Sequence, residues 1–132
     1  MDTKNTAENE KNASRSILDL EKAVALGVWI QVIGHIIEVT SLSELLETES
    51  SPESTGEKQI ITGVWFQTIG HILEAVSVTN QIGLTDTARL LEEQKIAIAG
   101  DVLVSLGAAI EAVGGIKVLK EEEQGAAPLI VT

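Results

Sequence analysis

The sequence predicts an all-α protein, an up-down-up bundle of three long helices that associates into homo-oligomers. Two observations point to this fold class. The chain carries three degenerate copies of a repeat of about 36 residues, and its apolar content is aliphatic, with one Phe, two Trp and no Tyr among 44% hydrophobic residues. Aliphatic residues interspersed with Glu and Lys favour helices over a β-sandwich. The length of 132 residues fits one domain.

The repeat is clearest in segments 27–38 and 63–74, which are identical at nine of twelve positions and offset by 63 − 27 = 36 residues. A third, weaker copy begins at Gly100 and keeps Gly107 and Glu111 at the same internal spacing. A repeat of this length is typical of one helical unit stacked on the next.

Few residues between Ser16 and Glu47 oppose a helix, and Ser14 or Ser16 can cap its start. Segment 48–56 is rich in Ser and Thr and contains Pro52, so it is predicted to be a loop. The helices are therefore expected at about 15–47, 57–79 and 86–124.

The connections and ends follow from the remaining turn residues. Gly83 indicates a turn, after which Thr85 or Asp86 can cap the third helix, and Gly125 fits a C-terminal cap. We expect residues 1–14 to form a flexible polar tail and residues 125–132 a C-terminal tail.

A narrow stripe of glycines and polar residues runs along each predicted helix. At about 100° per residue, Gly27, Gln31, Gly34 and Glu38 share one side of a cylinder that is otherwise apolar. A glycine inside a helix costs about 1 kcal/mol relative to alanine, so glycines every seven residues predict close approach of helix backbones. The glycines expected to pack closely are Gly27, Gly34, Gly63, Gly70, Gly100, Gly107 and Gly114.

The same stripe suggests a metal site as an alternative. A His and a Glu three residues apart lie on one helix face, and helical bundles use such pairs to hold zinc or iron. The possible ligands are His35, Glu38, His71, Glu74 and Glu111. We favour a metal-free reading, in which these residues face water or form a buried hydrogen-bond network, because the third copy loses its histidine. No metal or other cofactor is therefore expected.

Trp29 and Trp65 occupy equivalent repeat positions roughly opposite the stripe, and their surroundings are Val, Ile and the third aromatic residue, Phe66. They are predicted to occupy the core or a subunit interface.

Composition and motifs exclude several functions. A net charge of −11 disfavours nucleic acid as a partner, and the absence of Cys excludes disulfides and thiolate chemistry. No phosphate-binding loop or nucleophile motif is present, so we expect no enzymatic activity. The N-terminus lacks an apolar signal region, which suggests a cytoplasmic protein. The apolar stretches 23–39 and 96–116 contain interior polar or charged residues, so neither is a good candidate for a membrane span, and a membrane partner is disfavoured without being excluded.

The strings Gly27 to Gly34 and Gly63 to Gly70 resemble the repeats of a family of small repetitive helical proteins of spore-forming bacilli. Those repeats read Gly, x, Trp, Ile, Gln, Ala, Ile, Gly. The resemblance covers the three repeat cores and implies a repetitive helical fold without any known activity. His35 and His71 depart from the family pattern.

The apolar cylinders have more surface than a three-helix bundle can bury. The sequence therefore predicts a non-enzymatic, self-associating structural or interaction protein whose partner is a second copy of itself. A metal-binding bundle and a membrane-interacting or pore-forming protein are the alternatives.

Overall fold

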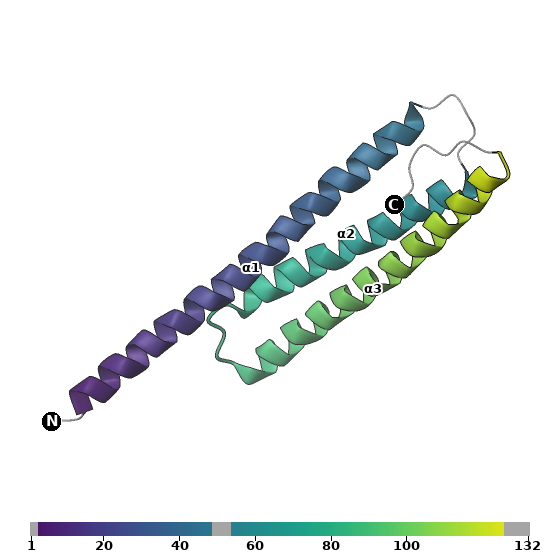
Figure 1. Cartoon of the computed structure of the whole chain (residues 1–132). Helices are drawn as coiled ribbons and strands as arrows, with labels where there is room; N and C mark the ends of the chain where they lie inside the picture. Colours follow the sequence, from purple (N-terminus) through teal and green to yellow (C-terminus); the bar gives the residue numbers. More distant parts are fainter. Residues whose placement is uncertain (1–2, 49–53, 126–132) are drawn as a thin grey trace.

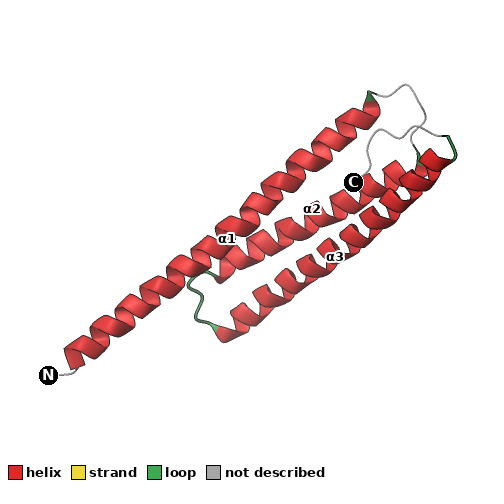
Figure 2. Cartoon of the chain, in the orientation of Figure 1, coloured by secondary structure: helices red, strands yellow, loops and turns green. Residues whose placement is uncertain are grey.

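The computed structural model describes residues 3–48 and 54–125, which form three helices without any strand in these two ranges (Figures 1 and 2). Helix α1 spans Thr3–Glu47, α2 spans Thr55–Gln81 and α3 spans Thr87–Glu123. Neighbouring helices run in opposite directions. The predicted all-α, three-helix fold is confirmed.

Helix α1 begins earlier than expected, at Thr3 instead of residue 15, so most of the expected flexible tail is helical. The reason lies in its composition, because residues 3–14 contain no Gly or Pro and place Lys4 four residues before Glu8. The expected C-terminal tail beyond Gly125 and the centre of the expected 48–56 loop, residues 49–53, lie outside the described residues.

Helix α2 begins at a capping box. The Ser54 side chain accepts a hydrogen bond from the Glu57 N–H at 3.1 Å, and the Ser54 N–H donates to the Glu57 carboxylate at 3.0 Å. This pair satisfies two of the backbone N–H groups that the start of a helix leaves without a partner in the helix. The helix therefore starts two residues before the expected position.

The turn between α2 and α3 contains Gly83, whose φ of 66° lies in the left-handed region. Asp86 caps α3 as expected, since its carboxylate accepts a hydrogen bond from the Ala88 N–H at 3.0 Å. Gly125, with φ of 91°, follows the end of α3, and its N–H donates to the Glu122 carbonyl at 2.9 Å. Both glycines thus lie where the sequence predicts chain reversal or helix termination.

Helix α2 lies between the other two helices, so the three form an open layer (Figure 1). Among the described residues, no Cα atom of α1 comes within 8 Å of a Cα atom of α3. The arrangement is thus more open than a closed three-helix bundle, in which each helix contacts both others. One consequence is that α1 and α3 each have a single packed side.

The contact between α1 and α2, here called the histidine seam, follows a spacing of three and four residues on both helices. Val28, Val32 and Val39 are buried on α1, and the residues at the same repeat positions of α2 are buried as well. Those equivalents are Val64, Thr68 and Ala75. A period of 3.5 residues is that of an antiparallel coiled coil, in which one side of each helix stays on its partner. The seam is therefore built from equivalent positions of two repeats.

The N-terminal part of α1 extends past the layer. The turn at Gly83 lies beside α1, where the Gly83 N–H donates to the Glu21 carboxylate at 3.0 Å and a Cβ on Gly83 would be 3.6 Å from Leu18. Residues before this point continue beyond the end of α2 (Figure 1). Segment 3–17 is exposed along its whole length.

Candidate functional site

The contact between α2 and α3, here called the glycine seam, is built on glycines spaced by seven residues on both helices. Each glycine of α2 faces one glycine of α3 in antiparallel order. The pairs are Gly56 with Gly114, Gly63 with Gly107, and Gly70 with Gly100. All six glycines are buried.

The two backbones are too close at this seam for any side chain. A Cβ built on Gly63 would lie 2.5 Å from the Gly107 carbonyl oxygen and 2.6 Å from the Glu111 nitrogen. A Cβ on Gly70 would lie 2.6 Å from the Gly100 carbonyl oxygen. Because the obstacles are backbone atoms, neither helix can yield by rotating a side chain. The close packing of the two backbones offsets the loss of helix stability that a glycine causes inside a helix.

Gly56 also packs closely, although the surrounding Ser, Thr and Pro residues predict a loop and not a packed helix. A Cβ on Gly56 would be 2.7 Å from the Gly114 carbonyl oxygen. The sequence feature that indicates its packing is its position, since Gly56 lies seven residues before Gly63 and so continues the glycine spacing.

A polar bridge crosses the glycine seam beside its central glycine pair. The Gln67 Nε2 donates a hydrogen bond of 2.5 Å to the Glu111 Oε2. Gln67 is buried and Glu111 is half-buried, and each follows a seam glycine, Gly63 or Gly107, by four residues. One heptad beyond the Gly70 pair, the Ser77 hydroxyl donates to the Glu93 carbonyl, so the backbones remain close there.

Gly27 and Gly34, which belong to the same repeat positions as Gly63 and Gly70, have a different environment. A Cβ built on either would have nothing within 4 Å. Within one chain, therefore, these two glycines do not pack closely, because the histidine seam occupies another side of α1. The α1 stripe, defined as Gly27, Gln31, Gly34 and Glu38, has no helix against it among the residues that the structure describes.

His35 and His71 stack on each other in the histidine seam. Their ring centroids are 4.7 Å apart and their planes differ by 20°. Each Nδ1 lies near the glutamate three residues later on its own helix, 3.2 Å for His35 and Glu38 and 3.3 Å for His71 and Glu74. The stack separates two apolar clusters of the seam and forms its polar layer.

The possible metal ligands are not gathered at one point. His35 and His71 lie between α1 and α2, whereas Glu111 lies across the glycine seam, where it accepts the Gln67 hydrogen bond. Within residues 3–48 and 54–125, no group of three or more His, Asp or Glu side chains is arranged to hold a metal ion. The two histidines stack on each other between the helices, and each Nδ1 lies near a glutamate of its own helix.

The two tryptophans lie at the surface. Trp29 is 39% exposed and Trp65 is 47% exposed, while Phe66 is half-buried. The Trp29 indole N–H donates to the Thr79 hydroxyl at 2.9 Å, which ties α1 to α2. Neither tryptophan therefore lies in the core of a single chain.

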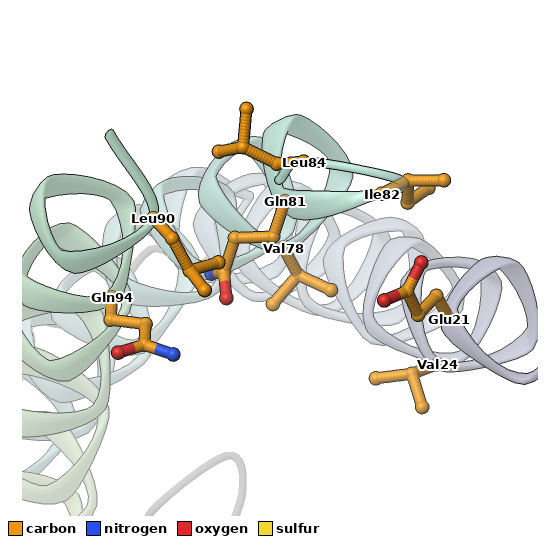
Figure 3. A pocket seen from close by; sticks show the side chains of 8 residues that line it. All are labelled: Glu21, Val24, Val78, Gln81, Ile82, Leu84, Leu90 and Gln94. Atoms are coloured by element: carbon orange, nitrogen blue, oxygen red, sulfur yellow. The ribbon is translucent and has the colours of Figure 1, made fainter. Parts of the chain in front are cut away.

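A hollow of about 370 Å³ opens near the α2–α3 turn, with α1 along one side (Figure 3). Its walls are largely aliphatic, including Val24, Val78 and Leu90. Two of its polar residues already have partners, because Glu21 accepts from the Gly83 N–H and Gln81 donates to Ser77. The hollow is a widening between the separated helices α1 and α3 and lacks converging polar groups of the kind that orient a ligand.

Two of the described helices are long and apolar enough to cross a membrane. The most apolar 18-residue stretch has a mean hydropathy of 1.6 in α1 and 1.9 in α3, and only 22% and 11% of these stretches is buried. By length and composition, both helices are therefore candidate membrane spans in spite of their interior charges.

No family model, curated protein or solved structure matches the chain. The resemblance to the repetitive proteins of spore-forming bacilli therefore stays a prediction.

Proposed function

We propose that this chain is a non-enzymatic, self-associating helical protein with a structural or interaction role. The observation that carries the proposal is the balance between exposed and buried apolar side chains. Twenty-two large hydrophobic residues are exposed among the described residues, whereas ten hydrophobic residues are buried. A cytoplasmic location belongs to this proposal and rests on the sequence alone.

The exposed residues are concentrated rather than scattered. On α1, the segment between Val24 and Ile37 contributes seven of them, because only one side of this helix is packed. Monomeric soluble proteins rarely expose apolar patches larger than a few hundred Å². Burying one Leu or Ile side chain yields about 1.5–3 kcal/mol, so covering such a surface with another chain favours association.

Helix α3 presents a second surface of the same kind. It contacts α2 through its glycines, whose lack of side chains leaves the large aliphatic residues on other sides of the helix. Those exposed residues are Leu91, Ile96, Ile98, Val102, Leu106, Val113, Ile116 and Leu119. An assembly can therefore cover apolar surface on both outer helices.

Light scattering of the purified full chain at micromolar concentration tests this proposal. We expect a mass of at least two chains. The assembly should persist at high salt, because apolar burial is strengthened by salt whereas exposed ion pairs are screened. A monomer of 14.0 kDa under these conditions would contradict the proposal.

Membrane association is a second candidate, favoured by the length and hydropathy of α1 and α3. Flotation with vesicles of neutral phosphatidylcholine distinguishes it from self-association in water. Neutral lipid is the appropriate probe, because the net charge of −11 opposes binding to anionic headgroups. Under the leading proposal the chain stays in the aqueous fraction as an oligomer, whereas co-flotation of most of the protein would favour the membrane.

A further inference from the structure

We propose that the α1 stripe packs antiparallel against the α1 stripe of a second copy of this chain, in a two-fold symmetric dimer. This inference rests on the proposed self-association and specifies its surface and register. It places Gly27 opposite Gly34 of the second copy and Gln31 opposite Glu38 of the second copy.

The internal symmetry of the chain identifies the place of the missing neighbour. The histidine seam uses equivalent repeat positions of α1 and α2, and the equivalent residues His35 and His71 stack at its centre. An approximate two-fold axis between antiparallel α1 and α2 therefore passes near this stack. In this chain α3 covers the stripe of α2. A rotation about the two-fold axis moves α3 onto the stripe of α1, which is therefore the place where a neighbouring helix is missing.

The glycine seam shows what kind of surface covers such a stripe. Segments 27–38 and 63–74 are identical at nine of twelve positions, and the second of these packs its glycines onto glycines of α3. In this chain the stripes of α2 and α3 already bury each other. A second copy therefore offers one matching free stripe among its described residues, that of its own α1.

The polar residues determine the direction of packing. In the glycine seam, Gln67 and Glu111 each follow a paired glycine by four residues and form a hydrogen bond. Gln31 and Glu38 follow Gly27 and Gly34 by the same interval. An antiparallel pair thus forms this bridge twice, whereas a parallel pair places the two Glu38 carboxylates together, with their charges repelling.

The apolar residues beside the stripe agree with the same register. Ile60 precedes Gly63 by three residues and Val118 follows Gly107 by eleven, and both are buried in one cluster, with 2% and 0% exposure. Their equivalents in the proposed dimer are Val24 and Leu45, which are 58% and 37% exposed in the single chain. The dimer brings Val24 of one copy into the same apolar cluster as Leu45 of the other.

Cross-linking of the full chain with a bifunctional thiol reagent that spans about 12 Å tests the register, and the natural absence of Cys makes single-cysteine variants clean. A mixture of Val24→Cys and Leu45→Cys should form a cross-linked dimer with this reagent, whereas neither variant should do so alone. In the antiparallel register, two copies of position 24 are about 20 Å apart and two copies of position 45 more than 40 Å, by the rise of 1.5 Å per residue. Positions 24 and 45 of different copies are eight residues apart along the helix axis, about 12 Å, which the reagent spans and a direct disulfide, limited to Cα atoms within about 7 Å, does not.

A Gly27→Leu, Gly34→Leu double variant tests the surface independently. The leucines fit the single chain because nothing lies within 4 Å of either position, so helical content should be retained while the scattering mass falls to that of one chain. Ile33→Ala is the control, since Ile33 is exposed on the same helix about 100° from Gly34 and its loss should leave the dimer intact.

The outcomes separate this inference from the proposed function. Cross-linking of Val24→Cys with itself, or an oligomer that survives the double glycine variant, would overturn the α1 register and leave self-association standing. A wild-type chain that is monomeric throughout would overturn both.

Discussion

Gly63 and Gly107 face each other so closely that a Cβ atom on either residue would lie 2.5 Å from the carbonyl oxygen of the other. The contact is reciprocal and involves backbone on both sides. It makes the positions of the paired glycines intolerant of any side chain, and it explains why the backbones of α2 and α3 can approach so closely.

Gly63→Ala and Gly107→Ala should each destabilise the chain by more than ~2 kcal/mol, because the added methyl group meets backbone and forces the helices apart. The measurement is the free energy of unfolding from denaturant melts. Wild-type stability in either variant would show that the two helices are further apart than described.

Gly34→Ala should act in the opposite direction. A Cβ at position 34 has open space in the single chain, so the substitution should stabilise α1 by about 1 kcal/mol through the better helix propensity of alanine. Melts must be recorded at concentrations low enough to dissociate any oligomer, because the same methyl group opposes docking of a second α1. A loss of stability in the dissociated chain would contradict an open environment at Gly34.

The contrast between Gly34 and Gly70 also marks the limit of sequence prediction. The seven-residue spacing was sufficient to predict that the glycines lie on one side of each helix. The spacing does not indicate which helices pack through their stripes. Segments 27–38 and 63–74 are nearly identical, so the stripe of either one could pack against the glycines of the third repeat. The tertiary arrangement alone gives α2 a neighbour on its stripe and leaves α1 without one.

The histidines show a similar limit. His35 immediately follows Gly34, and one residue corresponds to a rotation of about 100° around the helix axis. This rotation turns His35 away from the stripe and toward the neighbouring helix. The sequence pattern predicts one polar stripe that contains the glycines, the histidines and the glutamates. In the structure the glycines of α2 and α3 belong to the glycine seam together with Gln67 and Glu111, while His35 and His71 belong to the histidine seam.

Ser54→Ala should cost about 1 kcal/mol, because it removes the side-chain acceptor of the capping box at the start of α2. Thr55→Ala is the matched control, since Thr55 is an exposed neighbour and its substitution should change stability by less than about 0.5 kcal/mol. Thermal and denaturant melts of both variants provide the comparison. Equal effects would mean that the capping box adds nothing to the stability of the helix.

Added zinc or iron should leave the melting temperature unchanged. A metal that bound the folded state would raise it, but His35 and His71 each lie against a glutamate of their own helix, and no group of three ligands occurs in the described residues. Elemental analysis of untagged protein accompanies the melts. Stoichiometric metal that disappears in a His35→Ala, His71→Ala double variant would show that the ligands rearrange around an ion.

The hydrogen bond between Gln67 and Glu111 should show strong coupling in a double-mutant cycle. Gln67→Leu removes the donor and leaves the Glu111 carboxylate without it at a half-buried position, so we expect a loss of about 1–3 kcal/mol. Adding Glu111→Leu should recover part of that loss, because replacing both polar partners by apolar ones removes the unsatisfied group. Denaturant melts of the two single variants and the double variant give the coupling free energy. Strictly additive losses would show that the two side chains do not depend on each other, and the bridge would then lose its value as a template for Gln31 and Glu38 between copies.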